Sequence, residues 1–161
     1  MVKKSHILVI ISLIIVLIVF KSLKLEQYPY IPSDALEYID SSNLLYNNLD
    51  AHPTRPLGYA LILGIPNLFK ESVTLIEYRI YSSLLNLMIW LTTVLFLYKT
   101  LNLFISKKVS FISTILFILC IGNICQIFVI SSETIVTLLL VLMSFNLFKY
   151  LNNEVVKYLI I

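Results

Sequence analysis

Two acidic residues that lie far apart in the chain, Asp34 and Glu133, are the first candidates for chemistry. Each stands at the expected start of a helix that borders an apolar segment. An acid beside lipid is costly unless it is hydrated or used, so both positions need an explanation. If the two carboxylates converge at one membrane surface, they could hold a divalent metal cation, or act as a general base and a metal ligand. The alternative is structural, with Asp34 capping one helix and Glu133 complementing the N-terminus of another.

Arg55 is the third candidate, in the run Arg55-Pro56-Leu57-Gly58-Tyr59. A guanidinium can bind a phosphate in bidentate fashion, and the neighbouring Pro and Gly would hold the backbone open around it. The alternative is an interfacial Arg that pairs with lipid headgroups. His52, between an acid-rich helix and Pro53, is expected to be an ordinary loop histidine.

The composition indicates a membrane protein rather than a soluble domain. Of the 161 residues, 59% are hydrophobic and 13% are charged, and the mean hydropathy is +0.92. A soluble domain has about 45–50% apolar and about 25% charged residues. The net charge of +3 is modest, and the Lys residues cluster at the ends of apolar runs. That pattern favours the flanks of membrane spans over a nucleic-acid-binding surface.

Four apolar segments are long enough to cross a bilayer, at about residues 6–23, 80–98, 109–130 and 134–150. Residues 24–79 then form an outer loop. Seven of the twelve Lys and Arg residues fall on the opposite, inner side, which places the N-terminus in the cytoplasm. We therefore predict an all-α, polytopic membrane protein in which residues 1–161 form one membrane domain. Because the last residues, 155–161, open another apolar run, we expect the N-terminal part of a larger protein.

The outer loop carries the longest polar stretch, residues 32–59. Asp34 begins a predicted helix over residues 34–49, and Glu37 completes a capping-box-like pair with it. One face of this helix is apolar, so the helix should lie along the membrane surface. The apolar face holds Ala35, Tyr38, Ile39, Leu45, Tyr46 and Leu49, opposite Glu37, Asp40, Ser41, Asn47 and Asn48. The segment 57–69 is apolar but short, which suits an interfacial or re-entrant segment. The alternative is a short, tilted span, which would reverse the orientation of everything after it.

The third predicted span contains two amides and two thiols. Asn123 and Gln126 are expected to be interhelical hydrogen-bond partners. Cys120 and Cys125 have a spacing that suggests neither a metal site nor a disulfide, so we expect two buried thiols.

The order of these elements resembles the front end of the GT-C glycosyltransferases, in the bacterial branch related to protein mannosyltransferases and aminoarabinose transferases. A first span is followed by Asp34 with Tyr38 four residues on, and then by Arg55–Tyr59 opening an apolar stretch. In that family an Asp in the first outer loop is catalytic, and a P-x-G-Y-like stretch precedes the second span. Ser132-Glu133 is similar to the acidic position of the family's second outer loop.

The resemblance implies transfer of a sugar from a polyprenyl-phosphate-linked donor to an acceptor on the extracytoplasmic side of the cell membrane. It implies Asp34 as the general base and Glu133 as an assisting acid or metal ligand, with a divalent metal cation as a candidate cofactor. Arg55 would lie near the leaving phosphate, and Glu37 and Tyr59 would be further substrate-binding residues. Two alternatives stay open. A transporter or flippase subunit should bury ionisable residues near the bilayer midplane, and a non-catalytic membrane assembly protein should tolerate substitution of the outer-loop acids.

Overall fold

The computed structural model describes residues 4–22, 24, 33–55, 57–70 and 72–152. Within these ranges all regular structure is helical, so the all-α prediction is confirmed. The expected further apolar run at 155–161 lies outside the described residues. In chain order the elements are α1 (Lys4–Ser22), α2 (Ser33–Asn48), α3 (Leu57–Leu63), the 3₁₀ helix η1 (Ile65–Leu68), α4 (Leu75–Leu101), α5 (Lys107–Leu119), α6 (Ile121–Cys125), the 3₁₀ helix η2 (Gln126–Phe128) and α7 (Glu133–Asn152).

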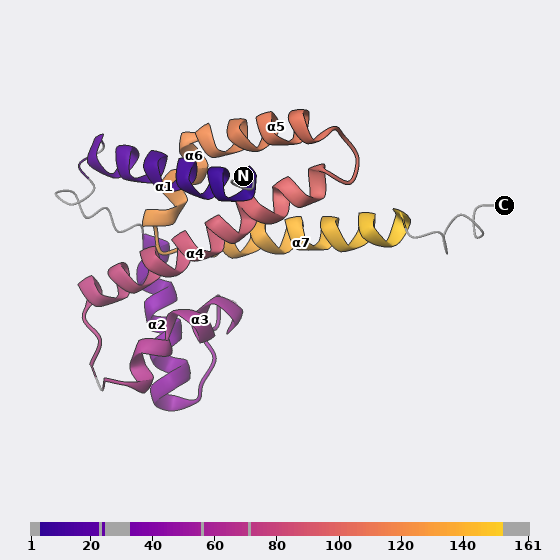
Figure 1. The fold of residues 1–161 in the computed structure, drawn as a ribbon. Helices are drawn as coiled ribbons and strands as arrows, with labels where there is room; N and C mark the ends of the chain where they lie inside the picture. Colours follow the sequence, from indigo (N-terminus) through magenta and orange to yellow (C-terminus); the bar gives the residue numbers. More distant parts are fainter. Residues whose placement is uncertain (1–3, 23, 25–32, 56, 71, 153–161) are drawn as a thin grey trace.

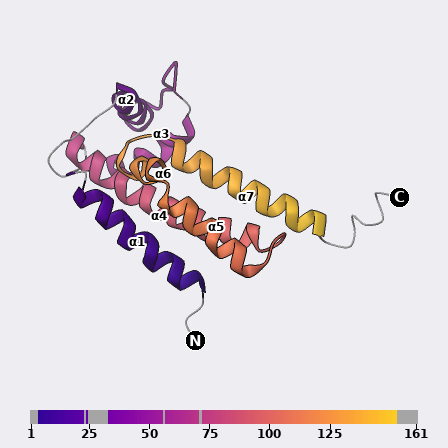
Figure 2. The same cartoon turned by 90° about the horizontal axis from the view of Figure 1, so that it is seen from above.

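The long helices form a bundle in which α4 is central. It packs against α1, α5 and α7, and α1 also contacts α5. Helices α1 and α5 run in one direction, and α4 and α7 run in the other (Figures 1 and 2). Three helices of the described chain, α1, α4 and α7, are long and apolar enough to cross a membrane. Small polar side chains are buried between the helices, which lets the backbones approach closely; they include Ser12, Ser82, Thr93, Ser110 and Thr114.

The third predicted span, 109–130, is not one straight helix. Helix α5 ends at Leu119 and α6 begins at Ile121, with the two directions bent by 61°, and only the bent pair together has the length of a span. Cys120, between them, has an extended backbone that interrupts the helix (φ −70°, ψ 103°). Gly122 and Asn123 follow, and both residue types favour helix weakly. Cys120 is exposed and Cys125 is half-buried, so the prediction of two buried thiols was wrong; both cysteines are free.

Helix α4 begins earlier than the apolar run that predicts it. Thr74 caps it, because the Thr74 side chain accepts from the Glu77 amide while the Glu77 carboxylate accepts from the Thr74 amide. Glu77 also pairs with Lys70 at 2.7 Å. Glu77 lies inside the first turn of the helix and Thr74 caps it, so hydropathy alone places the start too late.

Helix α2 runs across the direction of the long helices, at the end of the bundle where α4 begins (Figures 1 and 2). Its bounds agree with the predicted 34–49. Ala35, Tyr38 and Ile39 are buried as predicted, but Ser41 is also fully buried and Leu49 is 90% exposed. The predicted face is therefore wrong in its second half, because α2 packs against α3 and η1 rather than presenting that side to lipid.

The segment 57–69 forms α3 and η1, and both are too short to cross a bilayer. The Tyr46 hydroxyl donates to the Leu61 carbonyl at 2.6 Å, and the ring of Tyr46 occupies the position that a Cβ on Gly64 would take. A glycine is thus needed at residue 64 for α2 to approach this segment. The Tyr78 hydroxyl, 2.8 Å from Asn43 Oδ1 and from Asn67 Oδ1, links α2 and η1 to α4.

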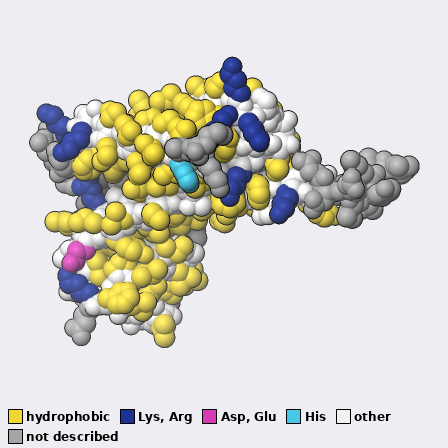
Figure 3. Space-filling model, viewed as in Figure 1, with side chains coloured by type: hydrophobic (Ala, Val, Ile, Leu, Met, Phe, Trp, Pro, Cys, Tyr) yellow, Lys and Arg dark blue, Asp and Glu magenta, His cyan; other side chains and the backbone are white. Residues whose placement is uncertain are grey.

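Large apolar side chains cover the outer faces of the long helices. Figure 3 shows them over most of one side of the molecule, with Lys and Arg side chains toward its two ends. On α1 and α7 the exposed residues recur at helical spacing; they include Ile10, Ile14, Leu17 and Ile18, and Leu139, Leu140, Met143 and Leu147. Exposed apolar faces of this length are typical of helices that contact lipid.

Candidate functional site

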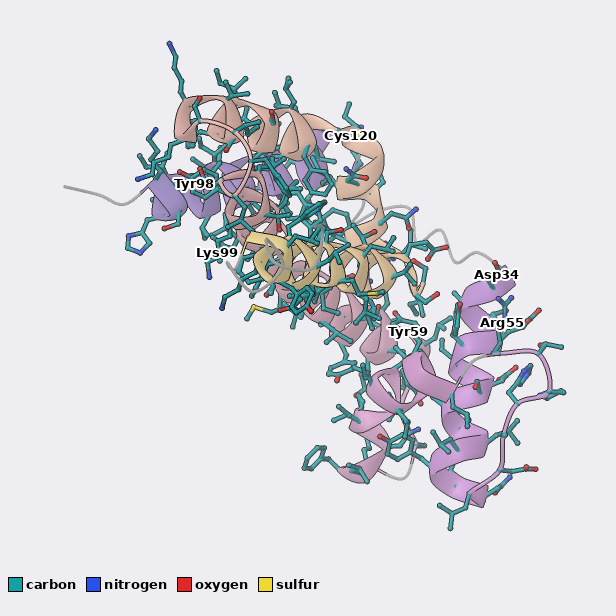
Figure 4. The ribbon with its side chains drawn as sticks, turned by 90° about the vertical axis from the view of Figure 1, so that its right-hand side faces the viewer. Asp34, Arg55, Tyr59, Tyr98, Lys99 and Cys120 are labelled. Carbon is teal, nitrogen blue, oxygen red and sulfur yellow. The ribbon has the colours of Figure 1, made fainter. Side chains whose placement is uncertain are left out.

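Arg55 joins the two acids at the start of α2. Its Nη2 donates to Asp34 Oδ1 and its Nε donates to Glu37 Oε2, each at 2.7 Å. The two acids are three residues apart on a helix, which places their side chains on the same face. Figure 4 shows Asp34 and Arg55 together at one end of α2. We call these three residues, Asp34, Glu37 and Arg55, the acid–arginine cluster.

The guanidinium of Arg55 is held from a second direction by Tyr38. Its Cζ lies 4.9 Å from the centre of the Tyr38 ring, a distance suited to a cation–π contact. The hydrogen bond that Arg55 donates to Glu37, together with the bond to Asp34 and the charges of both acids, raises the pKa of Arg55 against the opposing effect of burial. The cluster therefore holds a permanent cation beside two carboxylates, and Asp34 stays 64% exposed.

The predicted capping box is replaced by this cluster. Helix α2 begins at Ser33, so Asp34 lies inside the first turn, and residue 32 lies outside the described residues. In the described part of the chain the carboxylates of Asp34 and Glu37 both meet Arg55. A charged guanidinium is a stronger partner for a carboxylate than a backbone amide, which explains the difference.

Tyr38 also connects α2 to the start of α7. Its hydroxyl lies 3.0 Å from Ser132 Oγ, and Ser132 immediately precedes Glu133. The ring of Tyr59 meets the ring of Tyr38 edge-on, with centres 4.9 Å apart. Asp34 and Glu133 therefore lie at the same end of the helix bundle, joined through Tyr38 and its neighbours.

Tyr59 closes the inner wall of this site. Burial raises the pKa of its phenol above the ordinary value, and the nearby charge of Glu133 adds to the rise. The Ser131 backbone and the Asn86 side chain oppose the rise, but within the described residues the buried hydroxyl has no partner with full hydrogen-bond geometry. Tyr59 is therefore a neutral donor facing the bundle (Figure 4).

The five predicted site residues thus fall into three positions. Asp34, Glu37 and Arg55 contact one another directly. Tyr59 lies behind them, and Glu133 lies at the head of α7 beside the Tyr38–Ser132 contact.

A resident divalent cation does not fit this arrangement. The described residues hold no group of three or more His, Cys, Asp or Glu that could bind a metal ion. An ion at Asp34 would lie beside the positive charge of Arg55, which already bonds Oδ1. Ca²⁺ takes six to eight oxygen ligands. Two carboxylates supply only a few of these, so other groups would have to supply the rest. The roles proposed below therefore use only the chain's own side chains.

Sequence reasoning missed Asn86, which is fully buried in the middle of α4. Its Nδ2 donates to the Val129 carbonyl at 2.9 Å, and its Oδ1 accepts from Thr134 Oγ1 at 2.8 Å. These bonds fix the connection that carries Ser132 and Glu133. An isolated amide within an apolar run is the available signal, because such a side chain is expensive in lipid without a partner. The Gln126 carbonyl also accepts from Asn86 Nδ2, at 3.5 Å. Asn123 Nδ2 instead donates to the Phe117 carbonyl, within the bent α5–α6 pair.

No protein-family model, curated protein or solved structure matches the chain.

Proposed function

We propose that the protein is a membrane glycosyltransferase that moves a sugar from a polyprenyl-phosphate-linked donor to an acceptor on the extracytoplasmic side. The observation that carries the proposal is the Arg55 guanidinium, held between Asp34 and Glu37 at the end of the bundle where α7 begins. A site for this reaction needs a base for the acceptor hydroxyl and a cation for the phosphate that leaves. Both kinds of group are present within hydrogen-bonding distance of each other.

Each residue has a separate role in this proposal. Asp34, the more exposed acid, accepts the proton of the acceptor hydroxyl as the new glycosidic bond forms. Arg55 binds the phosphate as the bond from the sugar carbon to the phosphate oxygen breaks. Glu37 keeps Arg55 in place when the phosphate displaces Asp34 from the guanidinium. Tyr59 and Glu133 form the wall nearest the bundle, where a neutral hydroxyl and a carboxylate can orient the sugar.

The proposed location is the cell membrane, with the N-terminus on the cytoplasmic side. The three span-length helices and their exposed apolar faces support membrane insertion. Helix α2, which crosses the direction of the bundle, would then lie along the outer surface. Labelling of single cysteines from each side tests this orientation. Asn47→Cys should react with an impermeant reagent added outside intact cells, and Lys107→Cys should not. The reverse pattern refutes the proposed orientation.

The activity is tested with the full chain in reconstituted vesicles that contain a prenyl-phosphate-linked radioactive sugar. Asp34→Asn should abolish transfer, because the amide cannot accept the proton. Asp40→Asn is the matched control, since Asp40 is exposed on the same helix outside the acid–arginine cluster. Transfer that survives Asp34→Asn removes the base from the mechanism. A wild-type chain that is inserted, folded and unable to transfer any supplied sugar refutes the activity for this chain.

A transporter is the second candidate, because the broken α5–α6 pair brings amide side chains near Glu133. Discontinuous helices beside a carboxylate are a frequent feature of substrate sites in transporters. The same vesicles distinguish the two functions. If the radioactive lipid headgroup moves from the inside of the vesicles to the outside and no new glycosidic product forms, the result favours transport. If a glycosylated acceptor forms, the result favours transfer.

A further inference from the structure

Three helices each contribute one pair of side chains, three residues apart, to a small pocket inside the bundle. The pairs are Trp90 and Thr93 on α4, Asn123 and Gln126 on the bent pair, and Thr134 and Thr137 on α7. The pocket has a volume of about 30 Å³. A cavity needs about 10–15 Å³ to hold one water molecule, so this one has room for a single water.

Trp90, which lines this pocket, carries a buried hydrogen-bond donor. The residue is 3% exposed, and its buried indole N–H has no hydrogen-bond partner among residues 4–22, 24, 33–55, 57–70 and 72–152. An indole nitrogen can only donate, and buried Trp side chains usually find an acceptor. A species in the pocket that accepts a hydrogen bond would satisfy this donor.

The threonines on the pocket wall offer acceptors. Each hydroxyl proton is already used: Thr93 donates to the Ile89 carbonyl, Thr134 to Asn86 Oδ1 and Thr137 to the Glu133 carbonyl. The remaining lone pairs of these oxygens can only accept. A species that donates to these oxygens and also accepts from the indole nitrogen would suit both kinds of group, and a metal cation cannot accept a hydrogen bond.

Glu133 stands at the mouth of the pocket. It lines the cavity, and it is an exposed residue in the first turn of α7. The carboxylate is the strongest acceptor on the wall, because it is the only charged group there among the lining residues.

We propose that this pocket is a binding site for one ordered water molecule, which accepts from the Trp90 indole and donates to the oxygens of the wall, Glu133 foremost. A buried water with three hydrogen bonds is the common solution for polar groups in such positions. The water hydrates Glu133 from inside the bundle as well as from the surface. The proposal does not depend on glycosyl transfer, since it would hold equally in a transporter.

The single tryptophan of the chain gives a direct test. With ¹⁵N-labelled tryptophan in detergent micelles, the full-length protein should give one indole resonance, and this resonance should show a nuclear Overhauser contact to water. Measurements in sodium chloride and in choline chloride should give the same indole shift. An indole proton with no water contact overturns the proposal. A shift that depends on sodium also overturns it and indicates a cation.

A filled pocket provides the matched comparison. Thr137→Leu places a larger apolar side chain in the cavity and should remove the contact between the indole proton and water. Val136→Leu adds bulk at the exposed neighbouring position and should leave the contact unchanged. Retention of the contact in a folded Thr137→Leu variant overturns the proposal. The measurement on the unaltered protein decides the question even if that variant does not fold.

Discussion

Replacing Asn86 with Ala tests whether a buried amide fixes the position of α7 against α4. The change removes the bond to the Val129 carbonyl and the bond from Thr134. Hydrogen bonds between membrane helices contribute about 0.6 kcal/mol on average and up to about 1.7 kcal/mol. We therefore expect Asn86→Ala to lower the free energy of unfolding by about 1–3 kcal/mol. The measurement is a reversible unfolding titration with SDS in mixed micelles, followed by circular dichroism.

A double-mutant cycle separates this bond from general effects of the substitution. Thr134→Val keeps the shape of the side chain and removes the hydroxyl, so the cycle with Asn86→Ala should give a coupling of about 0.6–1.7 kcal/mol. Asn146→Ala is the control, because Asn146 is exposed and, among the described residues, its side chain bonds to the Leu142 carbonyl of its own helix. The reasoning is refuted if the coupling stays within about 0.3 kcal/mol, the scatter expected of independent sites. A cost no greater than that of the control also refutes it.

Three further substitutions test the region around the acid–arginine cluster. Gly64→Ala places a Cβ where the Tyr46 ring lies, so thermal unfolding should show a loss of about 1–3 kcal/mol, whereas Gly58→Ala meets no neighbour and should cost nothing; equal effects would contradict the close approach. Tyr59 has a raised pKa in the folded protein, so its contribution to stability is complete below about pH 10 and is lost as the pH rises above that value. Tyr59→Phe should reduce this loss of stability at alkaline pH. If stability falls with pH in the same way in the variant and in the unaltered protein, Tyr59 is not its cause. Arg55→Lys loses the rigid planar fork that bonds both carboxylates at once, so hydrogen exchange in the loop that carries residue 55 should accelerate, and an unchanged exchange rate would count against the bridge.

The candidate site was predictable as a set of residues but not as a set of contacts. Asp34, Glu37 and Arg55 attract attention because charged residues are rare in so apolar a chain. Their direct pairing depends on how the loop after α2 returns to the first turn of that helix. Sequence spacing fixes which residues share a helix face, but it does not say which loop residue will reach that face. The capping-box prediction failed for this reason.

The sequence by itself determined the helical class and the long apolar helices, because backbone groups in an apolar environment must be satisfied within each segment. It also indicated that 57–69 is short for a span, and the structure then divided this segment into the short helices α3 and η1. Only the tertiary structure decided the bend at Cys120, the burial of the Ser41 side chain and the hydrogen bonds of the Asn86 side chain. Each depends on what a side chain meets across a helix interface, and such contacts join residues too distant in the chain for local periodicity to relate them.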